Sequence, residues 1–127
     1  MSDNKTEILG MRPVIPVKNM EESLDYYQNK LGLELQFSHS DVPGAPANYA
    51  GLAREEFAIH LQAMVPGQDE AMPLIRVIVQ NIEPLYEELA GRGVVAASGE
   101  LDSKPWGTKE FGLYDPNGAG IVFYEVL

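Results

Sequence analysis

The sequence of 127 residues contains no cysteine and no long hydrophobic run. The absence of cysteine excludes disulfide bonds, thiolate zinc sites and cysteine nucleophiles. No apolar stretch approaches the ~20 residues of a membrane-spanning helix, and residues 1–10 are polar rather than typical of a signal peptide. We therefore expect a cytoplasmic protein that does not enter a membrane.

Positive charge is also scarce. Nine lysine and arginine residues stand against nineteen aspartate and glutamate residues, which gives a formal net charge of −10. Such a surface repels nucleic acid and anionic membranes, so we expect neither as a partner. The same surface would attract a cationic small molecule, although solubility alone also explains it. Charge thus excludes partners more firmly than it identifies them.

Hydrophobic residues make up 45% of the sequence. A chain of this length buries roughly two-thirds of its unfolded surface when it folds. Glycine and proline are spread along the chain, which is typical of a globular protein and not of a disordered or fibrous one. We predict a single domain spanning residues 1–127.

The two halves of the sequence repeat one pattern at an offset of 62 positions. Matching residues at this offset are Ile15 and Val77, Asn19 and Asn81, Leu24 and Tyr86, and Ile59 and Ile121. Each half predicts a strand, a helix and three further strands, in that order. The sequence therefore predicts an α+β fold of two βαβββ modules, module 1 over about residues 8–64 and module 2 over about residues 73–127.

Alternation of apolar and polar residues defines the strands. The predicted strands are residues 12–17, 34–38, 47–53 and 57–63 in module 1, and residues 74–79, 94–97, 110–114 and 120–126 in module 2. Asn19 and Asn81 are placed to cap the two helices. One face of each sheet is expected to pack on its helix, and the other face is left to line a ligand cleft.

Several short motifs make the chain similar to a known superfamily. These are Ile15-Pro-Val17, Tyr26-Tyr27, Leu31-Gly-Leu33, Leu85–Leu89, Pro105-Trp-Gly107, Glu110-Phe111 and the turn Asp115-Pro-Asn-Gly118. Together they resemble the vicinal-oxygen-chelate superfamily, which includes glyoxalase I, extradiol dioxygenases, fosfomycin-resistance enzymes and bleomycin-resistance proteins. The Pro-Trp-Gly motif favours the bleomycin-resistance branch, whereas the loop over residues 38–48 matches that branch poorly. The resemblance implies the glyoxalase/bleomycin-resistance fold, a curved mixed sheet with a ligand cleft.

The resemblance also identifies four positions at which superfamily enzymes hold a divalent metal. In this sequence they are Arg12, His60, Leu74 and Val122. Arginine is a permanent cation, and leucine and valine have no donor atom, so only the histidine could ligate a metal. One imidazole does not make a divalent catalytic site. We therefore expect no metal and no other cofactor.

Candidate ligand-binding residues are Phe37, Tyr49, His60, Trp106 and Glu110. The resemblance implies that the phenylalanine and the tryptophan stack on a planar ligand, although each could instead be an ordinary packing residue. His60 could contact the ligand, accept a proton or merely line the groove. The tyrosine could stack or hydrogen-bond and the glutamate could pair with a cation, unless they are ordinary strand residues.

These expectations favour a metal-free binding protein over an enzyme. The resemblance implies a homodimer that sequesters a planar ligand in clefts at the subunit interface. The acidic surface would favour a cationic ligand. Sequestering a drug in this way would be a role in antibiotic resistance. The alternative is a metal-dependent glyoxalase-type lyase or dioxygenase with an atypical site. A third alternative is an interaction module whose ancestral pocket has decayed. No catalytic residue can be assigned.

Overall fold

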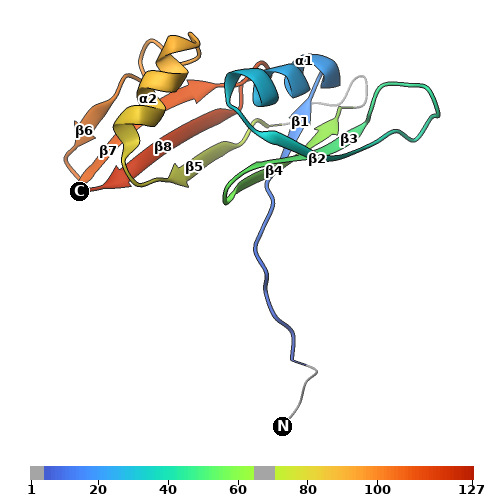
Figure 1. Cartoon of the computed structure of the whole chain (residues 1–127), viewed down its shortest axis with the longest axis horizontal. Helices are drawn as coiled ribbons and strands as arrows, with labels where there is room; N and C mark the ends of the chain where they lie inside the picture. Colours follow the sequence, from blue (N-terminus) through green and yellow to red (C-terminus); the bar gives the residue numbers. More distant parts are fainter. Residues whose placement is uncertain (1–4, 65–70) are drawn as a thin grey trace.

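The computed structural model describes residues 5–64 and 71–127, in which the βαβββ pattern occurs twice (Figure 1). Module 1 consists of β1 (Val14–Val17), α1 (Met20–Asp25), a π-helical continuation η1 (Tyr26–Lys30), β2 (Glu34–His39), β3 (Tyr49–Arg54) and β4 (Phe57–Ala63). Module 2 consists of β5 (Leu74–Ile78), α2 (Ile82–Gly91), β6 (Asp102–Lys104), β7 (Thr108–Tyr114) and β8 (Gly120–Val126). The predicted α+β class is confirmed. Residues 65–70, part of the predicted link between the modules, lie outside the described residues.

Each module forms one four-stranded sheet, in the orders β1-β4-β3-β2 and β5-β8-β7-β6. The first and last strands of a module pair in parallel, and the other neighbours are antiparallel. Figure 1 shows the sheets side by side, with α1 over the first and α2 over the second, on the same side. The opposite face of each sheet, called the open face below, carries none of the described helices.

The hydrophobic core lies between the sheets and their helices. The alternation predicted from the sequence puts Ile15, Ile59 and Leu61 on the helix side of the first sheet, where all three are fully buried. In the second sheet Ile121 and Phe123 take the same places, also buried. Because these residues all point toward the helices, the alternate residues are left on the open faces.

The two helices begin in different ways, although asparagine precedes both. The Asn19 side chain accepts a hydrogen bond from the backbone N–H of Glu22 at 3.0 Å, as predicted. Asn81 instead has a left-handed conformation (φ 61°) and makes no side-chain cap. The Glu125 carboxylate, from neighbouring β8, accepts the backbone N–H groups of Asn81 and Ile82 at 3.0 and 3.1 Å. The predicted asparagine cap of α2 is therefore wrong, because a residue distant in sequence satisfies those donors.

One predicted strand is absent from the structure, and several predicted strand boundaries differ from the observed ones by one or two residues. Residues 94–97 do not form a strand, apart from one bridge between Val95 and Leu113. The segment 96–99 runs irregularly along the edge of β7, where the N–H of Gly112 donates to the carbonyl of Gly99 at 2.9 Å, and β6 follows it along the same edge. At the other end, β1 begins at Val14, so Arg12 lies before the strand.

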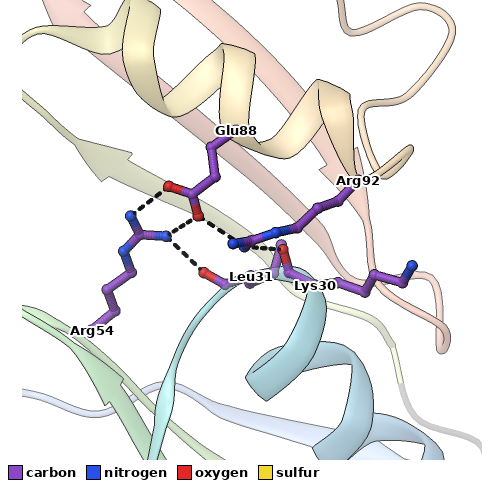
Figure 2. A network of polar contacts seen from close by, with 5 residues as sticks. All are labelled: Lys30, Leu31, Arg54, Glu88 and Arg92. Carbon is purple, nitrogen blue, oxygen red and sulfur yellow. Dashed lines mark hydrogen bonds and ion pairs between the residues drawn. The ribbon is translucent and has the colours of Figure 1, made fainter.

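A polar network joins the modules on the helix side (Figure 2). Arg54, at the end of β3, makes two hydrogen bonds of 2.8 and 2.9 Å to the carboxylate of Glu88 on α2. Arg92 also bonds Glu88, and it donates to the backbone carbonyl of Lys30; Arg54 donates likewise to Leu31. Hydrogen bonding from Arg54, with Arg92 nearby, lowers the pKa of Glu88. The network holds the end of η1 against α2.

A second, buried network joins the modules through the turn between β7 and β8. The Asp115 carboxylate accepts the Tyr27 hydroxyl at 2.7 Å and the backbone N–H groups of Asn117 and Ala119 at 2.8 Å each. Asn117 in turn donates to the Ser23 hydroxyl of α1 at 3.0 Å. Burial, assisted by the nearby carboxylate, raises the pKa of Tyr27. The Asp-Pro-Asn-Gly motif therefore shapes a turn and fixes it to the helix of module 1.

Residues 5–13 form an extended arm that runs away from the two modules (Figure 1). Ile8, Leu9 and Met11 on this arm are among the most exposed large hydrophobic residues of the structure. None of the helices in the described ranges has the length and apolar character needed to cross a membrane.

Candidate functional site

Most of the exposed hydrophobic side chains on the two sheets lie on the open faces. On the first sheet they are Val14 and Phe37, and on the second they are Leu74, Ile78, Tyr114 and Val126, with Trp106 in the adjoining turn. A protein surface seldom collects so many large apolar groups without a partner or a ligand. The open faces are therefore the candidate functional surface.

Three predicted site residues form an aromatic cluster on the first open face. Phe37 on β2 and Tyr49 on β3 are nearly parallel, with ring centroids 6.2 Å apart and an interplanar angle of 16°. The His60 ring on β4 meets both edge-on, at 5.3 Å from each. The Tyr49 hydroxyl and His60 Nδ1 are 2.9 Å apart. This hydrogen bond fixes the imidazole ring, so Nε2 is the nitrogen left to meet a ligand.

Gly51 makes room for this cluster. It pairs with both Phe37 and His60 across neighbouring strands. A Cβ atom placed on Gly51 would overlap the ring of Phe37, so the ring lies directly over the backbone of β3. The absence of a side chain at this position allows the phenylalanine to lie flat on the sheet.

Trp106 lies on the second open face, at the tip of the turn between β6 and β7. The turn is closed by a hydrogen bond of 3.1 Å from the Gly107 N–H to the Lys104 carbonyl, and Gly107 has φ 90°. A three-residue turn that ends in left-handed glycine is typical of a tight hairpin. The indole is 66% exposed, while its Nε1–H donates to the carboxylate of Glu110 at 3.1 Å.

Glu110 is the hub of the second open face. Its Oε2 accepts hydrogen bonds from Arg76, Trp106 and Thr108 at 2.7, 3.1 and 2.7 Å, and its Oε1 accepts a second one from Arg76 at 3.3 Å. Arg76, on β5, reaches this carboxylate over the ring of Tyr124 in the intervening strand β8, with Cζ 4.5 Å from the ring centroid. One carboxylate thus bonds three side chains, which come from β5, from β7 and from the turn between β6 and β7.

The electrostatics of this hub follow from its hydrogen bonds. The bond from Arg76, supported by those from Thr108 and Trp106, lowers the pKa of Glu110 to about 2 although burial opposes the shift. A lowered carboxyl pKa stabilises the fold above the ordinary pKa of 4.5, and that stabilisation is lost as the pH falls through about 2. Glu110 is therefore a carboxylate at neutral pH, and Arg76 carries the balancing charge.

A hollow of about 200 Å³ lies beside this hub. Its floor is formed by open-face residues of β5, β7 and β8, and its wall by residues 96–100, beside the edge of β7. The lining includes Leu74, Ser98, Gly99, Glu100, Lys104, Glu110, Gly112 and Val122. The hollow is partly apolar, with a hydroxyl, a carboxylate and an ammonium group at its rim, which suits a small organic molecule.

The four positions at which the resembling enzymes hold a metal do not fit a divalent cation in this chain. His60 and Val122 lie on the final strands of the two sheets, whereas Arg12 lies before β1 and bonds the carbonyl of Met11. The described ranges, residues 5–64 and 71–127, contain no group of three or more His, Asp or Glu side chains arranged to hold a metal. The donors needed for metal-assisted chemistry are not supplied by these positions.

The five predicted ligand residues thus fall into two groups. Phe37, Tyr49 and His60 come together on the first sheet, and Trp106 and Glu110 come together on the second. No aromatic contact among the described residues joins one group to the other. The sequence analysis did not identify Arg76 as a site residue, although a lone arginine between apolar neighbours on β5 was a usable signal. It also missed the wall at residues 96–100, which has no motif.

Comparison with known proteins places this fold in a family. A model of the Glyoxalase/Bleomycin resistance protein/Dioxygenase superfamily matches residues 8–123. A bleomycin resistance protein from Geobacillus stearothermophilus is 25% identical over 132 residues, which cover 91% of this chain and 95% of that protein. A glyoxalase-related enzyme from Clostridium phytofermentans has a TM-score of 0.76 at 15% identity, covering 98% of this chain and all of that one (100%).

A second solved structure is similar to the same extent. An integron cassette protein from the Halifax Harbour sewage outfall has a TM-score of 0.73 at 24% identity, and the match covers 94% of this chain and 100% of that one. These likenesses show the fold, and they agree with the two-module architecture described above. The family match over residues 8–123 shows that the chain belongs to the Glyoxalase/Bleomycin resistance protein/Dioxygenase superfamily.

Proposed function

We propose that this protein binds and sequesters a planar small molecule, without a metal, between the open faces of two subunits. The observation that carries the proposal is the pair of preorganised aromatic groups, the Phe37 cluster on one sheet and Trp106 on the other. Flat exposed rings held in place by neighbours stack on a planar ligand at little entropic cost. The bleomycin resistance proteins among its relatives support a small-molecule ligand.

The proposed homodimer supplies what one chain lacks. Within one chain the two aromatic groups lie on different sheets, and each open face leaves large apolar residues exposed. In the dimer, Phe37 of one protomer would face Trp106 of the partner subunit across a shared cleft. A two-fold arrangement makes two such clefts, because each protomer then contributes one module to each.

The net negative charge of the protein acts on a charged ligand at long range. The net charge of −10 concentrates cations around the protein, so we propose that the planar ligand is a cation. The attraction is screened by salt, which predicts faster association at low ionic strength. Stacking in the cleft would then supply most of the affinity.

Titration with bleomycin should quench the fluorescence of Trp106, the only tryptophan in the chain. We expect half-saturation at roughly micromolar concentration or below, corresponding to at least ~8 kcal/mol of binding free energy. The melting temperature should rise with drug concentration, because a ligand that binds only the folded state stabilises it. Trp106→Phe is the control for the optical signal, since its binding can be followed by calorimetry. Flat fluorescence together with an unchanged melting temperature would refute drug binding.

Mixing two inactive variants should restore binding if the clefts are shared between subunits. Phe37→Ala and Trp106→Ala each damage both clefts of their own dimer. A mixed dimer has one doubly damaged cleft and one intact cleft, so random mixing should return about a quarter of the original sites. Calorimetric stoichiometry before and after subunit exchange measures this. If the site lies within one chain, mixing will restore nothing.

A further inference from the structure

Two large flat side chains on the second open face are ordered by a single buried carboxylate. The Trp106 indole is 66% exposed and the Arg76 side chain is 43% exposed, so packing alone does not fix either. Glu110, whose side chain is only 7% exposed, bonds both from beneath. A surface tryptophan without such a bond would sample several rotamers, and a ligand would have to order it.

Most of the hydrogen-bonding capacity of Glu110 is already in use. Its oxygens accept two bonds from Arg76, one from Trp106 and one from Thr108. An ionised carboxylate offers about four lone-pair sites. Three of the four bonds fall on Oε2, and the side chain is only 7% exposed, so a cationic ligand has little access to this carboxylate. The arrangement favours a role in positioning over direct contact with the ligand.

The carboxylate of Glu110 also fixes the planar guanidinium group of Arg76, which presents a flat surface. One side of its guanidinium lies over the Tyr124 ring at 4.5 Å, and its edge is occupied by the two bonds to Glu110. A guanidinium fixed in this way stacks on planar rings as well as on tyrosine. Its charge is balanced by the buried partner, so stacking does not require a ligand of opposite sign.

We propose that Glu110 is a positioning residue, which holds the Trp106 indole and the Arg76 guanidinium as one flat surface for the ring system of the ligand. This role rests on the proposed function for its ligand. The ordering of Trp106, however, is a property of the free protein and can be measured without any ligand.

The first experiment compares Glu110→Gln with the wild-type protein in the absence of ligand. The variant weakens the bond to the indole and removes the charge that anchors Arg76. We expect lower fluorescence anisotropy of Trp106, a weaker near-ultraviolet circular dichroism band and faster hydrogen exchange at the indole N–H. The control is Glu83→Gln, which removes the same charge from an ion pair with Lys109 on the helix side of the sheet. It should change none of these signals.

A measurement on the wild-type protein protects the test against a variant that does not fold. Trp106 gives the only indole N–H resonance, because the chain has no other tryptophan. The bond to Glu110 should slow its exchange with water well below that of a free indole. Exchange at the free-indole rate, or signals in folded Glu110→Gln that match wild type, would overturn the proposal.

The second experiment separates positioning from direct contact by using two planar probes of opposite charge, proflavine and 1-pyrenesulfonate. If Glu110 positions the surface, Glu110→Gln should weaken both by roughly three- to tenfold in calorimetric titrations. A loss confined to the cation would show direct pairing and overturn the proposal. If neither probe binds the wild-type protein, the proposed function fails for such ligands, while the free-protein signals still decide the role of Glu110.

Discussion

Replacing Asp115 by alanine should lower the free energy of unfolding by about 3 kcal/mol, one of the two largest effects expected from a single change. The carboxylate accepts three hydrogen bonds, including one from the buried hydroxyl of Tyr27. Its removal leaves that hydroxyl without a partner and releases the turn between β7 and β8 from module 1. Denaturant unfolding followed by circular dichroism measures the change.

Two further variants test the cause of that loss. Tyr27→Phe removes only the hydroxyl, and combining it with Asp115→Ala should give less than the sum of the separate losses, because both remove the same bond. Asp102→Ala is the matched control, since its side chain is 69% exposed and its nearest cation is 3.7 Å away. It should change stability by no more than about 0.5 kcal/mol. A loss below about 1 kcal/mol for Asp115→Ala would contradict this account.

Gly99→Ala should destabilise the protein by about 2 kcal/mol and also weaken ligand binding. The added Cβ would lie 2.5 Å from the carbonyl oxygen of Gly112, a backbone atom that cannot move aside. The segment 96–100 would have to move away from the edge of β7, which breaks the hydrogen bond of 2.9 Å between Gly112 and Gly99. The wall of the hollow would move with it.

Thermal unfolding measures the loss of stability in Gly99→Ala, and calorimetric titration with proflavine measures the loss of ligand binding. The matched control is Gly91→Ala, at the end of α2, where an added Cβ meets no atom within 4 Å. Alanine is a better helix former than glycine, so this control should be neutral or stabilising by up to ~1 kcal/mol. Equal behaviour of the two variants would show that the packing of this segment beside β7 does not depend on Gly99.

The sequence predicts the fold well because strands and turns leave patterns among residues that are close together in the sequence. Alternation identified the strand Phe57–Ala63 to the residue, and glycine-containing turns marked the hairpins. The same kind of evidence failed at residues 94–97, because alternation reports an apolar face and not a pairing partner. The irregular path of residues 96–100 beside β7 depends on the close approach of Gly99 to Gly112, a contact between two glycines that leaves no pattern.

The candidate site also has one part that local sequence patterns predict and one part that they do not. Phe37, Tyr49 and His60 meet because they lie on adjacent strands, and predicting those strands was nearly enough to bring them together. The bond from Arg76 to Glu110 spans two strand spacings, since β8 lies between β5 and β7. Its existence depends on sheet order and on the length of an arginine side chain, neither of which is a local property of the sequence.

The parallel pairing of the first and last strands of each module has a consequence for how the chain folds. Val14 pairs with His60 in the first sheet, and Leu74 pairs with Gly120 in the second, which are equal separations of 60 − 14 = 46 and 120 − 74 = 46 residues. The entropy lost in closing a loop depends on its length, and contacts this distant slow folding. Both modules therefore meet the same entropic barrier before their first and last strands join. Chain length gives neither module a kinetic advantage, so any order of assembly must come from the turns and the packing that differ between them.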